Sequence, residues 1–84
     1  MSGLIDKSKR FARPVIIRSG GNDRIVVDVS AAARILLREF PRETAKRKEA
    51  MVACLGAIRG SAHTPFARRA FVVAALEVGI LAGD

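Results

Sequence analysis

Residues 14–28 read PVIIRSGGNDRIVVD and carry the clearest structural signal of the chain. Residues 15–18 and 24–28 form two runs rich in β-branched side chains, which is typical of strands. Residues 19–23 between them are dense in Gly, Asn and Asp, which is typical of a turn. We therefore predict a β-hairpin with a loop of about five residues. Pro14 opens the first strand, where a missing N–H is tolerated.

Three helical segments follow the hairpin, and each is bounded by residues that commonly begin or end helices. Ser, Thr and Pro favour helix starts, whereas Gly and a following Pro favour helix ends. We therefore predict an α+β fold in which an N-terminal two-stranded β-hairpin precedes three α-helices (β-β-α-α-α). The expected bounds are Ser30 to Phe40 before Pro41, Glu43 or Thr44 to Gly60, and Thr64–Pro65 to Gly79.

Apolar residues recur at spacings of three and four in all three helical segments, which predicts one buried face for each. The third segment is apolar nearly all round, and its alanines permit close contact between helices. The predicted core consists of Leu36, Phe40, Met51, Ile58, Phe71 and Val78. The predicted stripes are Ala33, Leu36, Leu37 and Phe40; Met51, Cys54, Leu55 and Ile58; and Ala67, Ala70, Phe71, Ala74 and Val78, with Val72, Leu76 and Ile80 on the other side.

The chain has 84 residues, which is enough for one domain, and half of them are apolar. We place this domain at residues 14–84, after a flexible basic arm at residues 1–13. A single cysteine excludes an internal disulfide and argues against a structural zinc site. Residues 1–13 hold no apolar run of signal-peptide length, and no stretch approaches the ~20 apolar residues of a membrane span. We therefore expect a cytoplasmic protein without a cofactor.

The formal net charge is +7, and the excess is confined to the arm and to residues 34–48. Clustered Lys and Arg favour contact with phosphate backbones or with acidic partners. No aromatic residue is interleaved with these charges for base stacking, so a basic face that is merely solvated is the competing interpretation. The candidate contact residues are Lys7, Lys9, Arg10, Arg13, Arg34, Arg38, Arg42, Lys46, Arg47 and Lys48.

Three further candidates are small sites. Cys54 lies on an apolar stripe, which favours a core cysteine over a reactive thiol. His63 lies in a loop with no acidic neighbour in sequence, which favours a solvated side chain over acid–base chemistry. Ser61, Thr64 and Arg68 surround the start of the third helix and could hold an anion there, although every helix start shares these features. No catalytic constellation emerges, so we do not expect an enzyme.

The hairpin carries apolar side chains on both of its faces, and so few helices cover only one face of a two-stranded sheet. Unpaired strand edges also invite another chain. We therefore expect a homodimer, the alternative being that the three helices wrap the hairpin sufficiently. The resulting functional hypothesis is a non-catalytic interaction module that self-associates and recruits a protein partner. The competing hypothesis is a small nucleic-acid-binding protein that uses the arm and the 34–48 cluster.

Several segments resemble the family called domain of unknown function 982, short proteins of rhizobia and related alphaproteobacteria. These segments are FARPV at residues 11–15, Phe40–Pro41, AIRG at residues 57–60, and ARRAFVVAALEVGI at residues 67–80. The family often has Trp where this chain has Phe40, a change that keeps an aromatic residue. The resemblance implies the fold predicted above and a bacterial cytoplasmic setting. It implies no activity and no functional residues.

Overall fold

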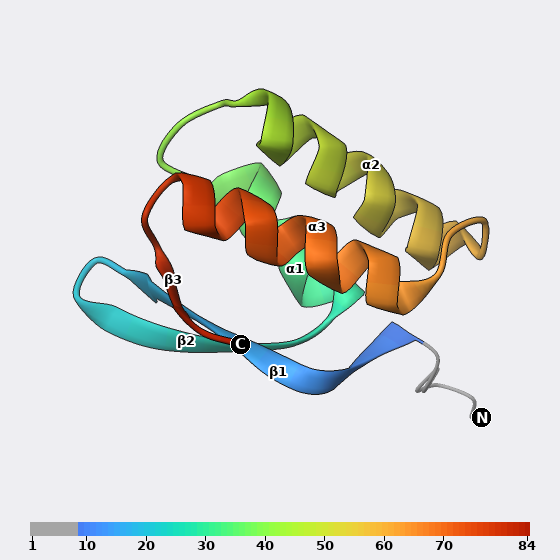
Figure 1. Ribbon diagram of the computed structural model, residues 1–84, viewed down its shortest axis with the longest axis horizontal. Helices are drawn as coiled ribbons and strands as arrows, with labels where there is room; N and C mark the ends of the chain where they lie inside the picture. The colour runs from blue at the N-terminus through green and yellow to red at the C-terminus, as the bar shows by residue number, and fades with distance from the viewer. Residues whose placement is uncertain (1–8) are drawn as a thin grey trace.

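The computed structural model describes residues 9–84 and confirms a mixed α+β architecture (Figure 1). The predicted hairpin and three helices are present in the predicted order, and a third short strand follows them. The elements are β1 (Arg10–Ser19), β2 (Asn22–Asp28), α1 (Val29–Arg38), α2 (Ala45–Arg59), α3 (Thr64–Glu77) and β3 (Leu81–Gly83).

The hairpin turn is tighter than predicted, because only Gly20 and Gly21 separate the strands. Both glycines have positive φ, 62° and 84°. Positive φ at both central positions is the geometry of a type I′ turn, whose twist matches that of the flanking strands. Ser19 pairs with Asn22, and Arg18 with Asp23. The predicted five-residue loop is therefore wrong, and its outer residues belong to the ladder.

Strand β1 begins at Arg10 rather than at Pro14, and Phe11 is already buried. The pairing of β1 with β2 shifts between Arg10 and Val15, so Pro14 occupies an irregularity of the ladder. Such a position tolerates the missing N–H of proline inside a strand. Residues 10–13 of the predicted arm are consequently strand, and its residues 1–8 lie outside the described residues.

Strand β3 pairs antiparallel with β1 and makes β1 the central strand, in the order β2-β1-β3. The chain reaches this position through Gly79, whose φ is 79°. The N–H groups of Gly79 and Ile80 donate to the carbonyls of Leu76 and Ala75, at 3.1 and 3.0 Å. This pair of bonds is a Schellman ending, and it confirms Gly79 as the end of the third helix.

Helices α1 and α3 lie on one face of the sheet, and α2 packs against both of them, running alongside α3 (Figure 1). The core between sheet and helices is built from small and branched apolar residues with two phenylalanines. It consists of Phe11, Val15, Ile17, Val26, Val29, Ala32, Ile35, Leu36, Ala50, Ala53, Cys54, Ala57, Ala67, Phe71, Ala74 and Ala75.

The N-cap of helix α1 is Asp28, two residues before Ser30, which we expected to cap the helix. The Asp28 carboxylate accepts a hydrogen bond of 2.8 Å from the N–H of Ala31. The helix ends at Arg38, before Phe40, and buries Val29, Ala32, Ile35 and Leu36. The buried face of α1 is displaced by about one residue from the predicted stripe, so Leu37 is exposed instead of buried.

The other two helices begin and end close to their predicted positions. Thr44 caps α2 by accepting from the N–H of Arg47, and Gly60 ends it with φ 87°. His63 is the N-cap of α3, one residue before the expected start at Thr64, and its side chain makes no capping bond.

The buried face of α2 is Ala50, Ala53, Cys54 and Ala57, because close packing on α1 and α3 selects small side chains. Larger residues are displaced to the margins, and Ile58 is exposed. Leu36 and Phe71 are confirmed as core. Phe40 and Met51 pack half-buried against the core, and Val78 is half-buried.

Candidate interaction surface

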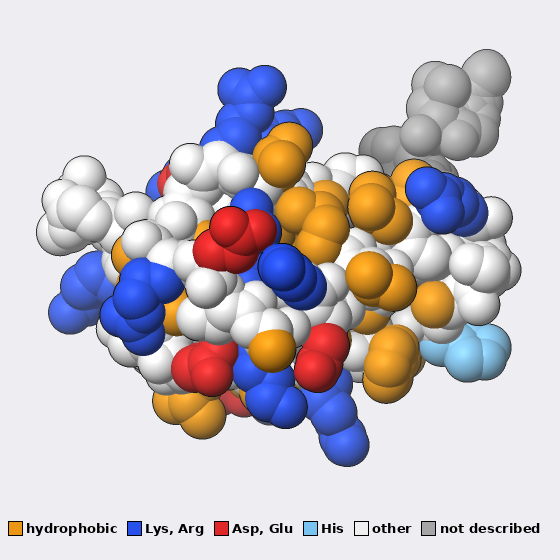
Figure 2. All heavy atoms as spheres, turned by 90° about the horizontal axis from the view of Figure 1, so that it is seen from above, with side chains coloured by type: hydrophobic (Ala, Val, Ile, Leu, Met, Phe, Trp, Pro, Cys, Tyr) orange, Lys and Arg blue, Asp and Glu red, His pale blue; other side chains and the backbone are white. Residues whose placement is uncertain are grey.

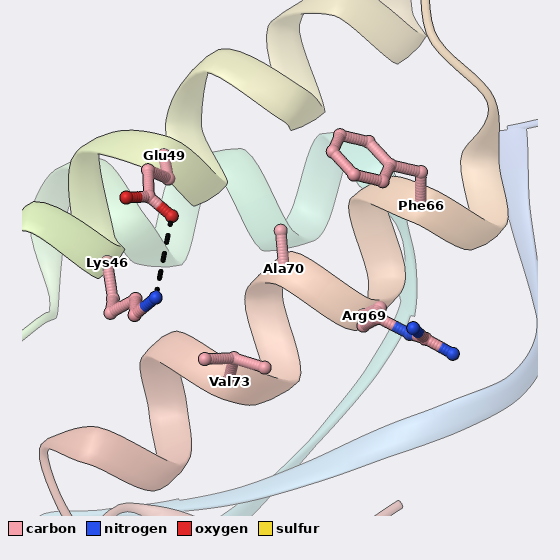
Figure 3. Close-up of a pocket in the computed structure, with 6 residues that line it drawn as sticks. All are labelled: Lys46, Glu49, Phe66, Arg69, Ala70 and Val73. Carbon is pink, nitrogen blue, oxygen red and sulfur yellow. Dashed lines mark ion pairs between the residues drawn. The ribbon is translucent and has the colours of Figure 1, made fainter.

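A groove runs between α2 and α3, and its two ends share Glu49 and Phe66 (Figure 3). It exists because the facing positions of both helices are small, which leaves the larger neighbours on the rim. One end encloses about 180 Å³, which is room for a single side chain, and the other end about 600 Å³, which lies within the range of about 300–1,000 Å³ that whole ligands usually occupy. The lining residues are Lys46, Glu49, Phe66, Arg69, Ala70 and Val73 at this end, and Lys48, Glu49, Val52, Ala53, Gly56, Ser61, Ala62 and Phe66 at the other.

Large apolar side chains stand exposed along this groove. Val52 is 71% exposed and Phe66 is 61% exposed at one end, and Val73, 39% exposed, lines the other end with Phe66. Figure 2 shows hydrophobic side chains gathered on this face with Lys and Arg beside them. Isolated exposed apolar residues are ordinary on a protein surface, but a contiguous group in a groove marks a contact site.

The charged residues of the groove are mainly cationic. The ammonium group of Lys46 lies 3.8 Å from the carboxylate of Glu49, one turn further along α2 (Figure 3). Lys48 and Arg69 are exposed and lie at opposite ends of the groove. The groove therefore combines an apolar floor with a net positive rim, and we call it the α2–α3 groove.

The predicted basic cluster at residues 34–48 does not form one face. Arg34 and Arg38 border a second groove, between α1 and α2, together with Leu37. Lys46 and Lys48 belong to the α2–α3 groove, and Arg42 is exposed in the connecting loop. Arg47 turns inward: its Nε donates to the carbonyl of Leu36 at 2.8 Å, and its Nη1 lies 3.7 Å from Glu43.

The candidates near the N-terminus are also divided. The ammonium group of Lys9 donates to the carbonyl of Ala57, at the end of α2, at 2.6 Å. Arg10 and Arg13 are exposed on β1. Lys7 lies outside the described residues.

Two of the three residues of the predicted anion site are engaged with the main chain. Arg68 donates from Nε to the carbonyl of Arg13 at 2.9 Å, and from Nη2 to the main-chain oxygen of Asp84 at 2.7 Å. The Ser61 hydroxyl donates to the carbonyl of Gly56, while Thr64 begins α3. These bonds give Arg68 and Ser61 structural roles at this position.

Cys54 is fully buried among the alanines of α2. Burial raises the pKa of its thiol from 9.0 to about 11, so the thiolate is scarce at neutral pH. His63 is exposed at the start of α3. Within residues 9–84, no group of three or more His, Cys, Asp or Glu side chains is placed to hold a metal ion.

None of the helices in the described part of the chain is long and apolar enough to cross a membrane.

Sequence reasoning missed the residues that define the groove. Phe66, Val73 and Val52 lie off the stripes that were assigned to the core. The spacing of Phe66 and Val73 marks a second apolar face of α3 beside the assigned stripe, since residues seven apart share one side of a helix. That spacing is the signal in the sequence that could have revealed the groove.

Comparison with known proteins relates the chain to a family. The model of a family described as protein of unknown function (DUF982) matches residues 13–82. No curated protein and no solved structure matches the chain.

Proposed function

Because the chain belongs to the DUF982 family of proteins of unknown function, we propose from its own surface that it is a non-catalytic interaction module. Its α2–α3 groove binds an amphipathic, acidic helical segment of another protein. The observation that carries this proposal is the exposure of Phe66 and Val52 in a groove with a cationic rim. The burial and raised pKa of the Cys54 thiol support a role without nucleophilic chemistry.

The shape of the groove favours a helix as the bound element. A helical segment presents apolar side chains at spacings of three, four and seven, which suits a groove between two helices. Burying Phe66 and Val52 against such side chains removes apolar surface from water and stabilises the complex. Lys46, Lys48 and Arg69 then favour Asp or Glu on the flanks of the ligand, chiefly by steering and orienting it.

Nucleic-acid binding is the less favoured alternative. Of the predicted contact residues, Lys9 and Arg47 donate hydrogen bonds to main-chain carbonyls, which commits their charges to the fold. The remaining described cations are spread over β1, the loop after α1 and two separate grooves instead of following one track. If about four phosphates were nonetheless contacted, affinity would fall on the order of 100-fold between 50 and 200 mM salt.

Selection from a random library of displayed peptides tests the proposal without knowledge of the natural partner. We expect enrichment of peptides with apolar residues at helical spacing and acidic residues on the flanks. An enriched peptide should lose at least ten-fold in affinity, or about 1.4 kcal/mol, against Phe66→Ser. Fluorescence anisotropy measures this loss.

Leu37→Ser is the matched control, since Leu37 is equally exposed, at 64%, but borders the other groove. It should bind the peptide like the unchanged protein. Enrichment of basic peptides, or equal binding by Phe66→Ser, would contradict the proposal. Salt-dependent binding of duplex or single-stranded DNA or RNA would favour the nucleic-acid alternative instead.

A further inference from the structure

The β2 strand forms an open edge of the sheet. Strand β3 covers the other side of β1, so the order β2-β1-β3 leaves β2 with one neighbour among the described residues. β2 has seven residues, whereas β3 at the opposite edge has three. An edge strand of this length presents unpaired N–H and C=O groups to any chain that can pair with it.

The register of the hairpin shows which groups face that edge. Antiparallel pairs alternate between pairs that exchange both hydrogen bonds and pairs that exchange none. The two-residue turn makes Ser19 and Asn22 a bonded pair, so Val15 and Val26 are also bonded, whereas Ile16 and Ile25 are not. The N–H and C=O groups of Asp23, Ile25 and Val27 therefore point away from β1.

This alternation limits how two copies of β2 can pair. Only the odd-numbered residues of β2 offer main-chain bonds at the edge, so two residues that bond across the copies are both odd-numbered. The midpoint of such a pair is a residue position, and the twofold axis therefore passes through one residue and its copy, not between two neighbouring residues. An axis at Val26 places Arg24 opposite Asp28 of the second copy, and the symmetry repeats this pair. An axis at Ile25 places Arg24 opposite Val26, and an axis at Val27 places Arg24 opposite Ser30. In both arrangements Arg24 has no acidic residue opposite it.

We propose that β2 pairs antiparallel with β2 of a second copy of this chain, about a twofold axis at Val26. Ile25 and Val27 of opposite copies exchange main-chain hydrogen bonds. Arg24 and Asp28 of opposite copies form a non-bonded pair, in which side chains approach most closely. The sheets of the two copies then continue as one six-stranded sheet.

The side chains involved are available for these contacts. Arg24 already binds the carboxylate of Glu39, but its side chain is 44% exposed and a guanidinium has five N–H donors. Asp28 uses Oδ1 to cap α1, and its second oxygen can accept from Arg24. On the uncovered face of the sheet, Ile25 is 66% exposed, and pairing brings it against Val27 of the second copy.

Light scattering during gel filtration, over loading concentrations up to about 1 mM, tests the pairing. Because only residues 24–28 pair, we expect a concentration-dependent rise from 9.0 kDa to twice that mass. Val27→Pro removes an N–H at the open edge, where proline is tolerated, and should keep the mass at 9.0 kDa. Val27→Ala retains the N–H and should still dimerise. A mass of 9.0 kDa for the unchanged chain at every concentration would overturn the proposal.

Cysteine cross-linking tests the register, and it does not depend on the folding of the proline variant. Ile25→Cys and Val27→Cys are made separately in a Cys54→Ala background, with different tags. Opposite bonded residues have Cα atoms about 5.5 Å apart, which suits a disulfide. Mixing the two variants under mild oxidation should give the mixed dimer. A disulfide between two copies of Ile25→Cys would contradict the axis at Val26. The absence of a disulfide both in that combination and between Ile25→Cys and Val27→Cys would also contradict it.

The dimer and the groove are separable. Phe66→Ser should dimerise like the unchanged protein, and Val27→Pro should still bind the groove peptide. Failure of one prediction therefore leaves the other measurable.

Discussion

Three cationic side chains that read as surface charge in the sequence instead hold the main chain in place. Lys9 and Arg47 bond carbonyls of α2 and α1, and Arg68 links α3 to β1. A Lys or Arg in a sequence gives no sign of whether its donors meet water, phosphate or a carbonyl, because the choice depends on tertiary neighbours. The charge of the predicted site could therefore be counted from the sequence, but its availability could not.

Cys54 makes the stability of the domain depend on pH. The thiol has a pKa of about 11 in the folded protein against 9.0 ordinarily, so the unfolded chain loses this proton first as pH rises. Since the folded state then binds more protons, the free energy of unfolding falls between about pH 9 and pH 11 and is unaffected by this group below pH 9. Urea unfolding at about pH 8 and about pH 10 measures the decrease.

Cys54→Ala provides the comparison, because lysines also titrate in this range. We expect the variant to be less stable at the lower pH through lost packing, and to lose less stability on going to the higher pH. Parallel losses in the two proteins would show that burial does not hold the thiol neutral. The role of Cys54 as a core residue was itself predictable, since it lies on the apolar side of α2.

The hairpin turn depends on backbone freedom at Gly21. Its φ of 84° is costly for any residue with a Cβ, although open space surrounds the position. Gly21→Ala should therefore lower the free energy of unfolding by about 1 kcal/mol for purely conformational reasons. Gly20→Asn should cost less, because Asn tolerates left-handed geometry and suits the first position of a type I′ turn. Urea denaturation of both variants checks the order, and equal losses would contradict it.

The ends of the helices could be predicted from the sequence, but their rotation could not. Thr44, Gly60 and Gly79 act through bonds within a few residues, so local sequence contains the whole cause. The buried face of α2 depends instead on how closely α1 and α3 approach, which local sequence does not contain. Large apolar residues were expected inside, but small ones allow closer packing, and Leu55 and Ile58 therefore face outward.

At the scale of the whole molecule, the third strand is the element of the described fold that the sequence did not predict. Leu81–Gly83 is too short and too small in its side chains to be distinguished from a loop by its pattern. It forms because Gly79 reverses the chain after α3 and brings it beside β1. By covering that side of β1 it leaves β2 as the longer open edge of the sheet among the described residues.

The net charge of +7 should make the fold more stable as salt is added. The molecule measures 37 × 24 × 19 Å, so at about 0.01 M salt, where screening extends ~30 Å, like charges repel across most of it. The ion pairs among the described residues are largely exposed and weakly stabilising. Raising NaCl to about 0.1 M shortens the screening length to ~10 Å, and we expect Tm to rise by a few degrees.

Two single-charge variants separate net repulsion from individual ion pairs. Arg42→Gln removes a cation that makes no ion pair among the described residues, whereas Arg18→Gln removes the partner of Asp23. Both lower the net charge by one. If repulsion dominates, Arg42→Gln raises Tm at low salt and makes Tm depend less on salt. Arg18→Gln raises Tm by a smaller amount, because Asp23 loses its partner. A Tm of the unchanged protein that falls with NaCl would instead mean that the attractive pairs outweigh the excess of positive charge.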